Sequence, residues 1–275
     1  MKRIFYKLAR EDGWDFYTGN TINYRENIGK VVKCPNPDPK MGVCSAGVIH
    51  ASKSPNECFV GASIPCSAYK VKGKPTCGDE TKYGFIELEV LEEIEDLDTL
   101  FGWKYCEAKN PLNPFTLGKK SPIKSDFEEL KRWHSVRDSV GYSIGNSVRA
   151  SVGASVGYSV GASVWDPMGY TMRDFVRASV GASVWDSVWD SMSDSVWAYV
   201  GSLFPNIKQW VNVKHRKGEY PFQSVVNLWK RGFVASYDGE KWRLHSGEKA
   251  EIVWEGTIKD LVWILHTNPI FFGKV

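Results

Sequence analysis

The spacing of apolar residues predicts strands near the N-terminus of the chain. Apolar and polar side chains alternate in residues 3–8, and two glutamates alternate with aliphatic residues in residues 83–90. Alternation with a period of two is typical of a strand with one buried face. The tight-turn signal at 12–13 predicts that residues 14–17 return as a partner strand, and residues 48–51 read as a further strand. These elements indicate an α/β or α+β domain.

Capping and turn signals predict more elements towards the C-terminus. Ser125 and Glu128 have the spacing of a capping box at a helix start, and Gly232 ends a second helix. Asp238-Gly239 is a hairpin signal. The expected C-terminal elements are a helix at 221–231, strands at 233–237, 241–244 and 251–254, and a short helix at 257–266. They describe a small α+β cap.

A four-residue repeat separates these two parts. From Ser135 to Val200 the chain reads as seventeen tetrads of the form Ser-Val-x-x, with serine first in thirteen of them. The second residue is always Val, Ile or Met, and the third is Gly, Arg or Trp in every tetrad but one. A position that accepts Gly, Arg and Trp alike cannot be packed at core density. We therefore expect the third and fourth residues to face solvent and Ser and Val to form an inner layer.

The repeat predicts a compact β-solenoid, with a helical array as the alternative. In an α-helix a four-residue step rotates the valine by about 40°, so the apolar stripe would wind almost twice around one long helix. Glycine at eight third positions also disfavours a helix. Four-residue strands would instead stack Val and Ser in ladders. The helical alternative is strongest for residues 183–204, where three tryptophans share one helical side.

Charge divides the chain into three parts. The chain is 43% hydrophobic and 24% charged, with a formal net charge of +3, which excludes wholesale disorder and a polycation. Residues 133–203 contain neither Lys nor Glu and carry −2, whereas residues 1–132 carry +1 and residues 204–275 carry +4. We interpret these breaks as domain boundaries. No apolar run of about 18 residues predicts a membrane span, so a cytoplasmic protein is expected, in the host cytoplasm if it is viral.

The cysteines offer one weak metal site. All six lie in the first part, without a C-x-x-C pair and without a secretory signal ahead of them, so reduced cysteines are the expected state. Cys34 and Cys44 with His50 are the candidate metal ligands. No cofactor is predicted.

Candidate catalytic groups are few. His50 on a strand could act as a general base, although a hydrogen-bonded core histidine is the commoner case. Tyr24-Arg25 with a later strand glutamate, Glu87 or Glu89, is similar to the residues of enzymes that transfer ADP-ribose from a nicotinamide cofactor. No phosphate-binding loop, dinucleotide fingerprint, nucleophile elbow or zinc-protease motif occurs. A non-catalytic protein is therefore favoured over an enzyme acting on nucleotide or nucleic acid in residues 1–132.

Aromatic residues of the repeat suggest a partner-binding face. Exposed Trp and Tyr at this density are typical of an interface, either with a protein partner or with another copy of the chain. The candidates are Tyr142, Tyr158, Trp165, Tyr170, Trp185, Trp189 and Trp197.

A third hypothesis is nucleic-acid binding by the C-terminal part. A helix followed by a basic, aromatic hairpin is the order of a winged nucleic-acid module, and Lys214, Arg216 and Lys217 form a basic run. A cap that closes the end of the repeat explains the same elements without such binding.

Two stretches resemble phage proteins. Residues 44–51, Cys-Ser-Ala-Gly-Val-Ile-His-Ala, followed by Ser54-Pro55, resemble an N-terminal domain of unknown function in phage and bacterial proteins. The Ser-Val-x-x tetrads are similar to arrays in uncharacterised phage and metagenomic proteins. The resemblance implies a viral or mobile-element origin and no particular activity.

Overall fold

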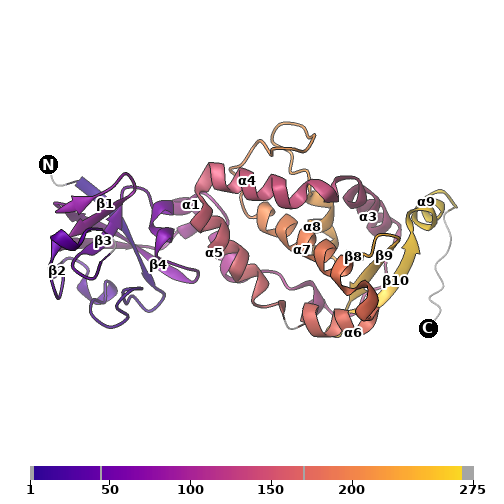
Figure 1. The fold of residues 1–275 in the computed structure, drawn as a ribbon, viewed down its shortest axis with the longest axis horizontal. Helices are drawn as coiled ribbons and strands as arrows, with labels where there is room; N and C mark the ends of the chain where they lie inside the picture. The colour runs from indigo at the N-terminus through magenta and orange to yellow at the C-terminus, as the bar shows by residue number, and fades with distance from the viewer. Residues whose placement is uncertain (1–2, 44, 170, 268–275) are drawn as a thin grey trace. The chain divides into compact units, whose positions relative to one another are not determined.

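The alternating N-terminal segments form strands of one sheet in a computed structural model, which describes residues 3–43, 45–169 and 171–267 (Figure 1). The chain divides into two compact units, residues 1–109 with 152–160 and residues 110–151 with 161–275. The division of the sequence into three parts by charge stays a prediction. The first unit contains β1 (Arg3–Arg10), β2 (Val31–Lys33), β3 (Ile49–Ser52), β4 (Cys66–Gly73), β5 (Cys77–Gly78), β6 (Lys82–Phe85), β7 (Glu87–Ile94), α1 (Leu97–Phe101) and α2 (Tyr105–Lys109).

The seven strands form an antiparallel sheet that opens in the middle. Its order is β2-β7-β4-β1-β3-β6-β5. β1 pairs with β4 along all eight residues, from Arg3 opposite Gly73 to Arg10 opposite Cys66. On its other side β1 pairs with β3 only through Tyr6 and Ser52. Two well-paired halves therefore diverge beyond one residue pair, and this opening positions the candidate site.

Two of the predicted strands differ from the structure. Residues 83–90 form two strands, because the chain leaves β6 at Phe85 and enters β7 at Glu87, on the opposite half of the sheet. Residues 14–17 form no strand, and only Trp14 makes an isolated bridge, to Asn23. Asp15 explains the second difference, since its carboxylate accepts hydrogen bonds from the backbone of the next residues and curls the segment into a turn.

The prediction of a β-solenoid is wrong, because the repeat is helical. No strand occurs among the described residues of 133–203. The segment forms the end of α3 (Lys124–Val136), then α4 (Val140–Val152), α5 (Ala154–Trp165), a π-helical stretch (Thr171–Val176), α6 (Arg177–Val180) and α7 (Trp185–Ser202).

The repeat can be helical because it is cut into short helices. The longest, α7, holds the second-position residues Val188, Met192, Val196 and Val200, all fully buried. Three steps of about 40° rotate these side chains by only about 120°, close to the width of an ordinary apolar stripe. The winding of the apolar stripe that disfavours a helix requires one uninterrupted helix over seventeen tetrads. The helices α4, α5 and α7 have 13, 12 and 18 residues, so the apolar stripe starts again in each of them before it has wound far around the helix.

Two of the breaks between these helices occur at glycines in the third position of a tetrad. Gly153 has φ +98° and Gly181 has φ +83°, and each lies at the end of a helix. Replacing either by alanine is expected to lower the free energy of unfolding by about 1–2 kcal/mol, because a Cβ is strained at positive φ. Urea denaturation measures this. Gly141→Ala in α4, where φ is not positive and a Cβ meets nothing within 4 Å, is the control. Equal stability of all three variants would contradict the prediction.

The predicted inner layer of Ser and Val holds only in part: most second-position residues are buried, but of the thirteen first-position serines five are buried and five are exposed. Two of the buried serines accept hydrogen bonds from neighbouring segments. The Ser147 hydroxyl accepts a hydrogen bond from the Val211 backbone N–H at 3.1 Å. The Ser191 hydroxyl accepts one from the Tyr237 N–H at 2.7 Å. Buried backbone groups of neighbouring segments must find partners, and a short hydroxyl on a helix can supply them without disturbing valine packing.

The C-terminal elements agree with the pattern in the sequence. They are α8 (Gln223–Lys230), a sheet of order β10-β9-β8 built from β8 (Val234–Tyr237), β9 (Lys241–Ser246) and β10 (Glu251–Thr257), and α9 (Ile258–Thr267). α7 packs on β8 and α8, and α3 packs on α8 and α9. The capping box at Ser125 is wrong: α3 begins at Lys124, and the Asp126 carboxylate accepts from the Ile123 N–H at 2.9 Å. None of the described helices is both long enough and apolar enough to cross a membrane.

Candidate functional site

A cavity of about 210 Å³ lies where β1 and β3 diverge. Past the single pair of Tyr6 and Ser52 the two strands no longer exchange hydrogen bonds, so side chains and loops fill the opening. The Cys58 thiol contacts the Tyr6 carbonyl at 3.2 Å beside this point. The cavity is lined by Lys7, Leu8, Asp15, Phe16, Tyr17, His50, Ala51, Ser52, Cys58, Val60, Gly61, Ala62 and Lys82.

A buried ion pair lies in the wall of the cavity. The Lys7 ammonium is 2.6 Å from the Asp15 carboxylate, and both side chains are about nine-tenths buried. Asp15 also accepts the Tyr17 N–H at 2.9 Å, the Thr18 N–H at 3.2 Å and the Tyr24 hydroxyl at 3.2 Å. Because every lone-pair direction is used, the pair meets the condition under which a buried carboxylate stays ionised.

The pKa of Asp15 reflects these contacts. Burial alone would raise it, but the charge of Lys7 and the hydrogen bonds from Lys7, Thr18 and Tyr17 lower it from 3.8 to about 2. Lys7 and Asp15 therefore cancel each other's charge at neutral pH. Together they add no net charge to the lining of the cavity, although the Lys7 ammonium still acts on His50.

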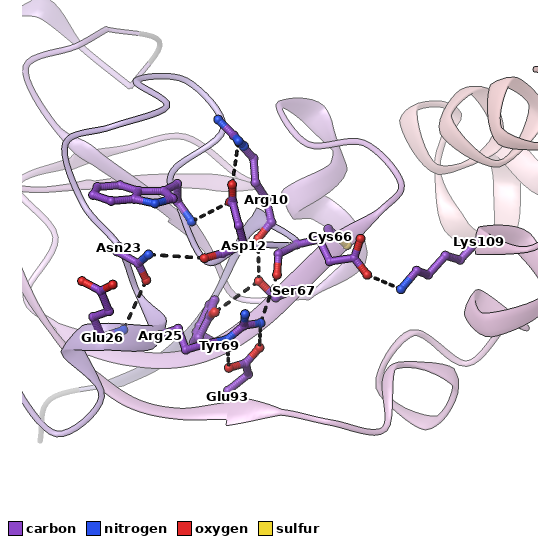
Figure 2. A network of polar contacts seen from close by, with 12 residues as sticks. Arg10, Asp12, Asn23, Arg25, Glu26, Cys66, Ser67, Tyr69, Glu93 and Lys109 are labelled. Carbon is purple, nitrogen blue, oxygen red and sulfur yellow. Dashed lines mark hydrogen bonds and ion pairs between the residues drawn. The ribbon is translucent and has the colours of Figure 1, made fainter.

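The loop that carries Asp15 is fastened to the sheet by a polar network. Figure 2 shows Asn23 bonded to the Asp12 backbone, at 3.3 Å, and Arg25 bridging to Glu93. The Arg25 guanidinium donates to both Glu93 oxygens, at 2.8 and 2.6 Å. A two-pronged contact of this kind fixes direction as well as distance. The network thus holds the loop in the position from which Asp15 reaches Lys7.

His50 lines the same cavity from β3. Its Nε2 atom is buried, and none of the described residues hydrogen-bonds to it. Burial lowers the pKa of His50 below 6.5, and the nearby charges of Lys7 and Lys82 lower it further. The shift favours the neutral imidazole, which bonds the Val43 backbone and leaves Nε2 without a partner among the described residues.

Lys82 adds a positive charge to the site, and the Asp79 carboxylate interacts with it electrostatically without forming an ion pair. It lies at the start of β6, opposite Ser52 in the sheet register. None of the acidic side chains in the described part of the chain forms an ion pair with it. Gly61 lies against its end: a Cβ there would be 3.8 Å from the Lys82 Nζ. Since Lys7 is neutralised, the lining of the cavity carries one net positive charge.

The aromatic side of the cavity belongs to the loop after β1. Phe16 is half-buried and Tyr17 is 71% exposed, and both line the opening. An exposed ring beside a cationic group is a surface on which a planar group of a ligand can stack.

The structure separates the residues chosen for ADP-ribose chemistry. Tyr24 is fully buried, with its hydroxyl on Asp15. Arg25 pairs with Glu93, while Glu87 lies on β7 and lines a different cavity with Lys72 and Lys74. Of the four catalytic candidates only His50 lines the cavity between β1 and β3.

The candidate metal ligands Cys34, Cys44 and His50 are not seen together as a metal site in the described part of the chain. The Cys34 thiol contacts the Ala46 carbonyl at 3.4 Å, and Cys44 lies outside the described residues. In the described ranges, no three His, Cys, Asp or Glu side chains are grouped so as to hold a metal ion, and the five described cysteines are free.

The aromatic residues of the repeat occupy two kinds of position. Trp165, Trp185 and Trp189 are half-buried, with Trp189 at 5.4 Å from each of the other two between ring centroids. Trp197 is half-buried over Gly161. Tyr142 and Tyr158 are 69% and 80% exposed, and Tyr170 lies outside the described residues. Partner binding through these residues stays a prediction.

The candidate nucleic-acid-binding residues of the C-terminal part lie at the surface. Lys214, Arg216 and Lys217 are exposed in the connection between α7 and α8. In contrast, Ser236 and His245 form a hydrogen bond of 2.8 Å with no access, because both are fully buried. Burial lowers the pKa of His245 to about 4, so this pair is a neutral structural contact rather than a nucleophile and its base.

The sequence contained weak signals for the residues it failed to single out. Lys7 interrupts an otherwise apolar strand face, since Phe5 and Ala9 on the same face are core residues. A charge at such a position implies a buried partner. Its partner Asp15 lies only eight residues further on, but in a turn that the pattern does not predict, and Lys82 comes from a distant part of the chain.

Comparisons with known proteins do not assign a function to this site. No protein-family model, curated protein or solved structure matches the chain. The resemblance to phage proteins stays a prediction.

Proposed function

We propose that the first unit binds a small organic anion with a planar ring, of the nucleotide class, in the cavity between β1 and β3. The observation that carries the proposal is the Lys82 ammonium, which forms no ion pair among the described residues and lines a cavity whose other charged groups, Lys7 and Asp15, form an ion pair with each other. The sequence suggested, as one alternative, a protein acting on nucleotides through residues 1–132. The present proposal names the cavity in which such a nucleotide would bind.

The charge of the cavity favours a phosphate group. A lysine is a point charge that binds phosphate oxygens without demanding a fixed geometry. His50 is not counted as a donor to the phosphate, because its ring already bonds the Val43 backbone and a neutral imidazole carries a single N–H. A cationic ligand would meet Lys82 without a free carboxylate to compensate it, because Asp15 is already committed to Lys7.

The size of the cavity sets which part of a nucleotide can enter. At about 210 Å³ it is smaller than the usual 300–1,000 Å³ of a drug-sized ligand site. The phosphate and sugar of a mononucleotide are expected to lie inside, with the base outside on the exposed Tyr17 ring. Stacking on an aromatic ring contributes about 1–3 kcal/mol per base.

Titration calorimetry with AMP, ribose 5-phosphate and inorganic phosphate tests the proposal. AMP should bind most tightly, ribose 5-phosphate at least about 10-fold more weakly, and phosphate weakest, because each loses a contact worth more than about 1.4 kcal/mol. Lys82→Gln is expected to weaken AMP binding by about 10-fold or more. Gly61→Leu should block entry, since the new side chain points at the Lys82 ammonium.

The matched control is Lys33→Gln. Lys33 is an exposed lysine on β2, at the far edge of the same sheet, so its loss changes the net charge equally and leaves the cavity intact. The proposal fails if wild-type protein takes up none of the three compounds, or if Lys82→Gln and Lys33→Gln bind AMP alike.

A further inference from the structure

The connection between α7 and α8 is held in a fixed shape although it contains neither helix nor strand. We call residues 205–222 the basic loop. The Trp210 and Tyr220 rings pack edge to face across it, with centroids 5.0 Å apart. The Gly218 N–H donates to the Lys208 carbonyl at 3.1 Å and closes the loop at its base. Compact loops of this kind, packed by their own side chains, are frequently functional.

A histidine fixes the tip of the basic loop. His215 Nε2 accepts the Trp210 N–H at 2.9 Å, which places the proton on Nδ1. Nδ1 then donates to the Arg216 carbonyl at 2.8 Å. The two bonds hold the segment 214–217 against the part of the loop around Trp210.

Two helices of the repeat form hydrogen bonds with the basic loop. Ser147 on α4 accepts the Val211 N–H, and the Tyr220 hydroxyl donates to the Ala198 carbonyl on α7. Trp210 is 2% exposed, so the aromatic side chain that shapes the loop is turned inward.

The cations of the basic loop point outward and are uncompensated. Glu219 is its single acidic residue. The described residues provide no ion pair to any of its four cations, all of them exposed: Lys208, Lys214, Arg216 and Lys217. A rigid backbone therefore presents four positive charges to solvent.

We infer that the basic loop binds nucleic acid through the phosphate backbone. Phosphate contacts from Lys and Arg position a protein on nucleic acid without reading its sequence. The rings of Trp210 and Tyr220 pack on each other inside the loop, so they do not stack on bases, and binding is expected to be independent of sequence. An anionic membrane fits less well, because membrane-binding segments insert apolar side chains and only Val211 of this loop exposes a large one.

Fluorescence anisotropy of the full chain with a labelled 20-base-pair DNA duplex of arbitrary sequence tests the inference. Wild-type affinity should fall steeply with salt, because each phosphate contact adds about 0.9 to the slope of log affinity against log salt concentration. The variant Lys214→Ser/Arg216→Ser/Lys217→Ser should bind at least about 30-fold more weakly at low salt, with the slope reduced by about 2–3. These side chains are exposed, so the fold is expected to persist, and circular dichroism verifies it.

A second triple variant separates local binding from net charge. Lys131→Ser/Lys249→Ser/Lys259→Ser removes three exposed lysines of the same unit outside the basic loop and should retain most of the affinity. Equal losses in the two triple variants would overturn the inference, as would absence of duplex binding by the wild type. Binding to phosphatidylserine vesicles without binding to the duplex would also overturn it and assign the loop to membranes.

Discussion

Replacing Asp15 with asparagine is expected to lower the free energy of unfolding of the first unit by about 3–5 kcal/mol. Asparagine has the shape of aspartate and can still accept the Tyr17 and Thr18 N–H groups. It cannot balance the Lys7 ammonium, which is about nine-tenths buried at 2.6 Å from the carboxylate. Removing one member of a buried pair leaves an uncompensated charge, and losses of this size follow.

Native-state hydrogen exchange of the β1 and β4 amides measures the effect in the intact chain, because those amides report on the unit that contains Asp15. Asp12→Asn is the matched control. Asp12 also pairs with a cation, Arg10, but both side chains are about half exposed, so at most about 1 kcal/mol should be lost. Equal protection in the two variants would show that burial of the Lys7–Asp15 pair does not matter.

The same pair predicts how the first unit responds to acid. The pKa of Asp15 is about 2 in the folded protein against 3.8 for the free group, so the unfolded chain takes up the proton first. The stabilisation is complete above about pH 4 and is lost as the pH falls through about 2. Asp15→Asn lacks this titration, so its protection should change less than that of the wild type between about pH 5 and 2.

Replacing Gly201 with alanine is expected to lower the stability of the second unit by about 3 kcal/mol. A Cβ at this position would overlap the Tyr220 hydroxyl oxygen and would lie 2.8 Å from the Ile144 Cδ1. Neither neighbour can withdraw easily, because Ile144 is fully buried and Tyr220 is bonded to the Ala198 carbonyl. Overpacking a dense core typically costs about 1–3 kcal/mol, and two such contacts place this site at the upper end.

Gly145→Ala gives the matched comparison, because Gly145 has the same third place in its tetrad and lies inside α4. A Cβ there meets nothing within 4 Å, so alanine should raise stability by about 0.5–1 kcal/mol through helix propensity. Urea denaturation followed by circular dichroism measures both variants. If Gly201→Ala were as stable as Gly145→Ala, the packing of Tyr220 against α7 would be wrong. Gly201→Ala should also weaken duplex binding while leaving every charge of the basic loop in place.

The local pattern predicted most elements whose contacts are close in sequence. The C-terminal hairpin around Asp238-Gly239, the helix before Gly232 and the strands at 3–8 and 48–51 were all identified. In each case the turn or the alternation that specifies the element lies within about ten residues of it. The prediction of a single strand at 83–90 is wrong because one alternating run contains two strands. Nothing in the local sequence indicates that β6 pairs with β3 while β7 pairs with β4.

The candidate site was much less predictable. His50 can be singled out from the sequence because histidine on a strand is chemically conspicuous, but the ion-pair partner of Arg25 cannot. Its partner is Glu93. Glu87 and Glu93 both lie on β7, and only the register against β4 and the path of the loop from β1 decide which of them Arg25 can reach.

By itself the sequence determined the largely buried second position of the tetrads, most of the alternating strands and the excess of positive charge near the C-terminus. These properties follow from side-chain chemistry and short periods, which act within one segment of backbone. The tertiary structure alone decided that the repeat is helical, that the sheet opens between β1 and β3, and that Lys7, Asp15, His50 and Lys82 surround one cavity. Each of these depends on segments far apart in the chain, whose pairing is settled by packing and by the need to compensate buried charge.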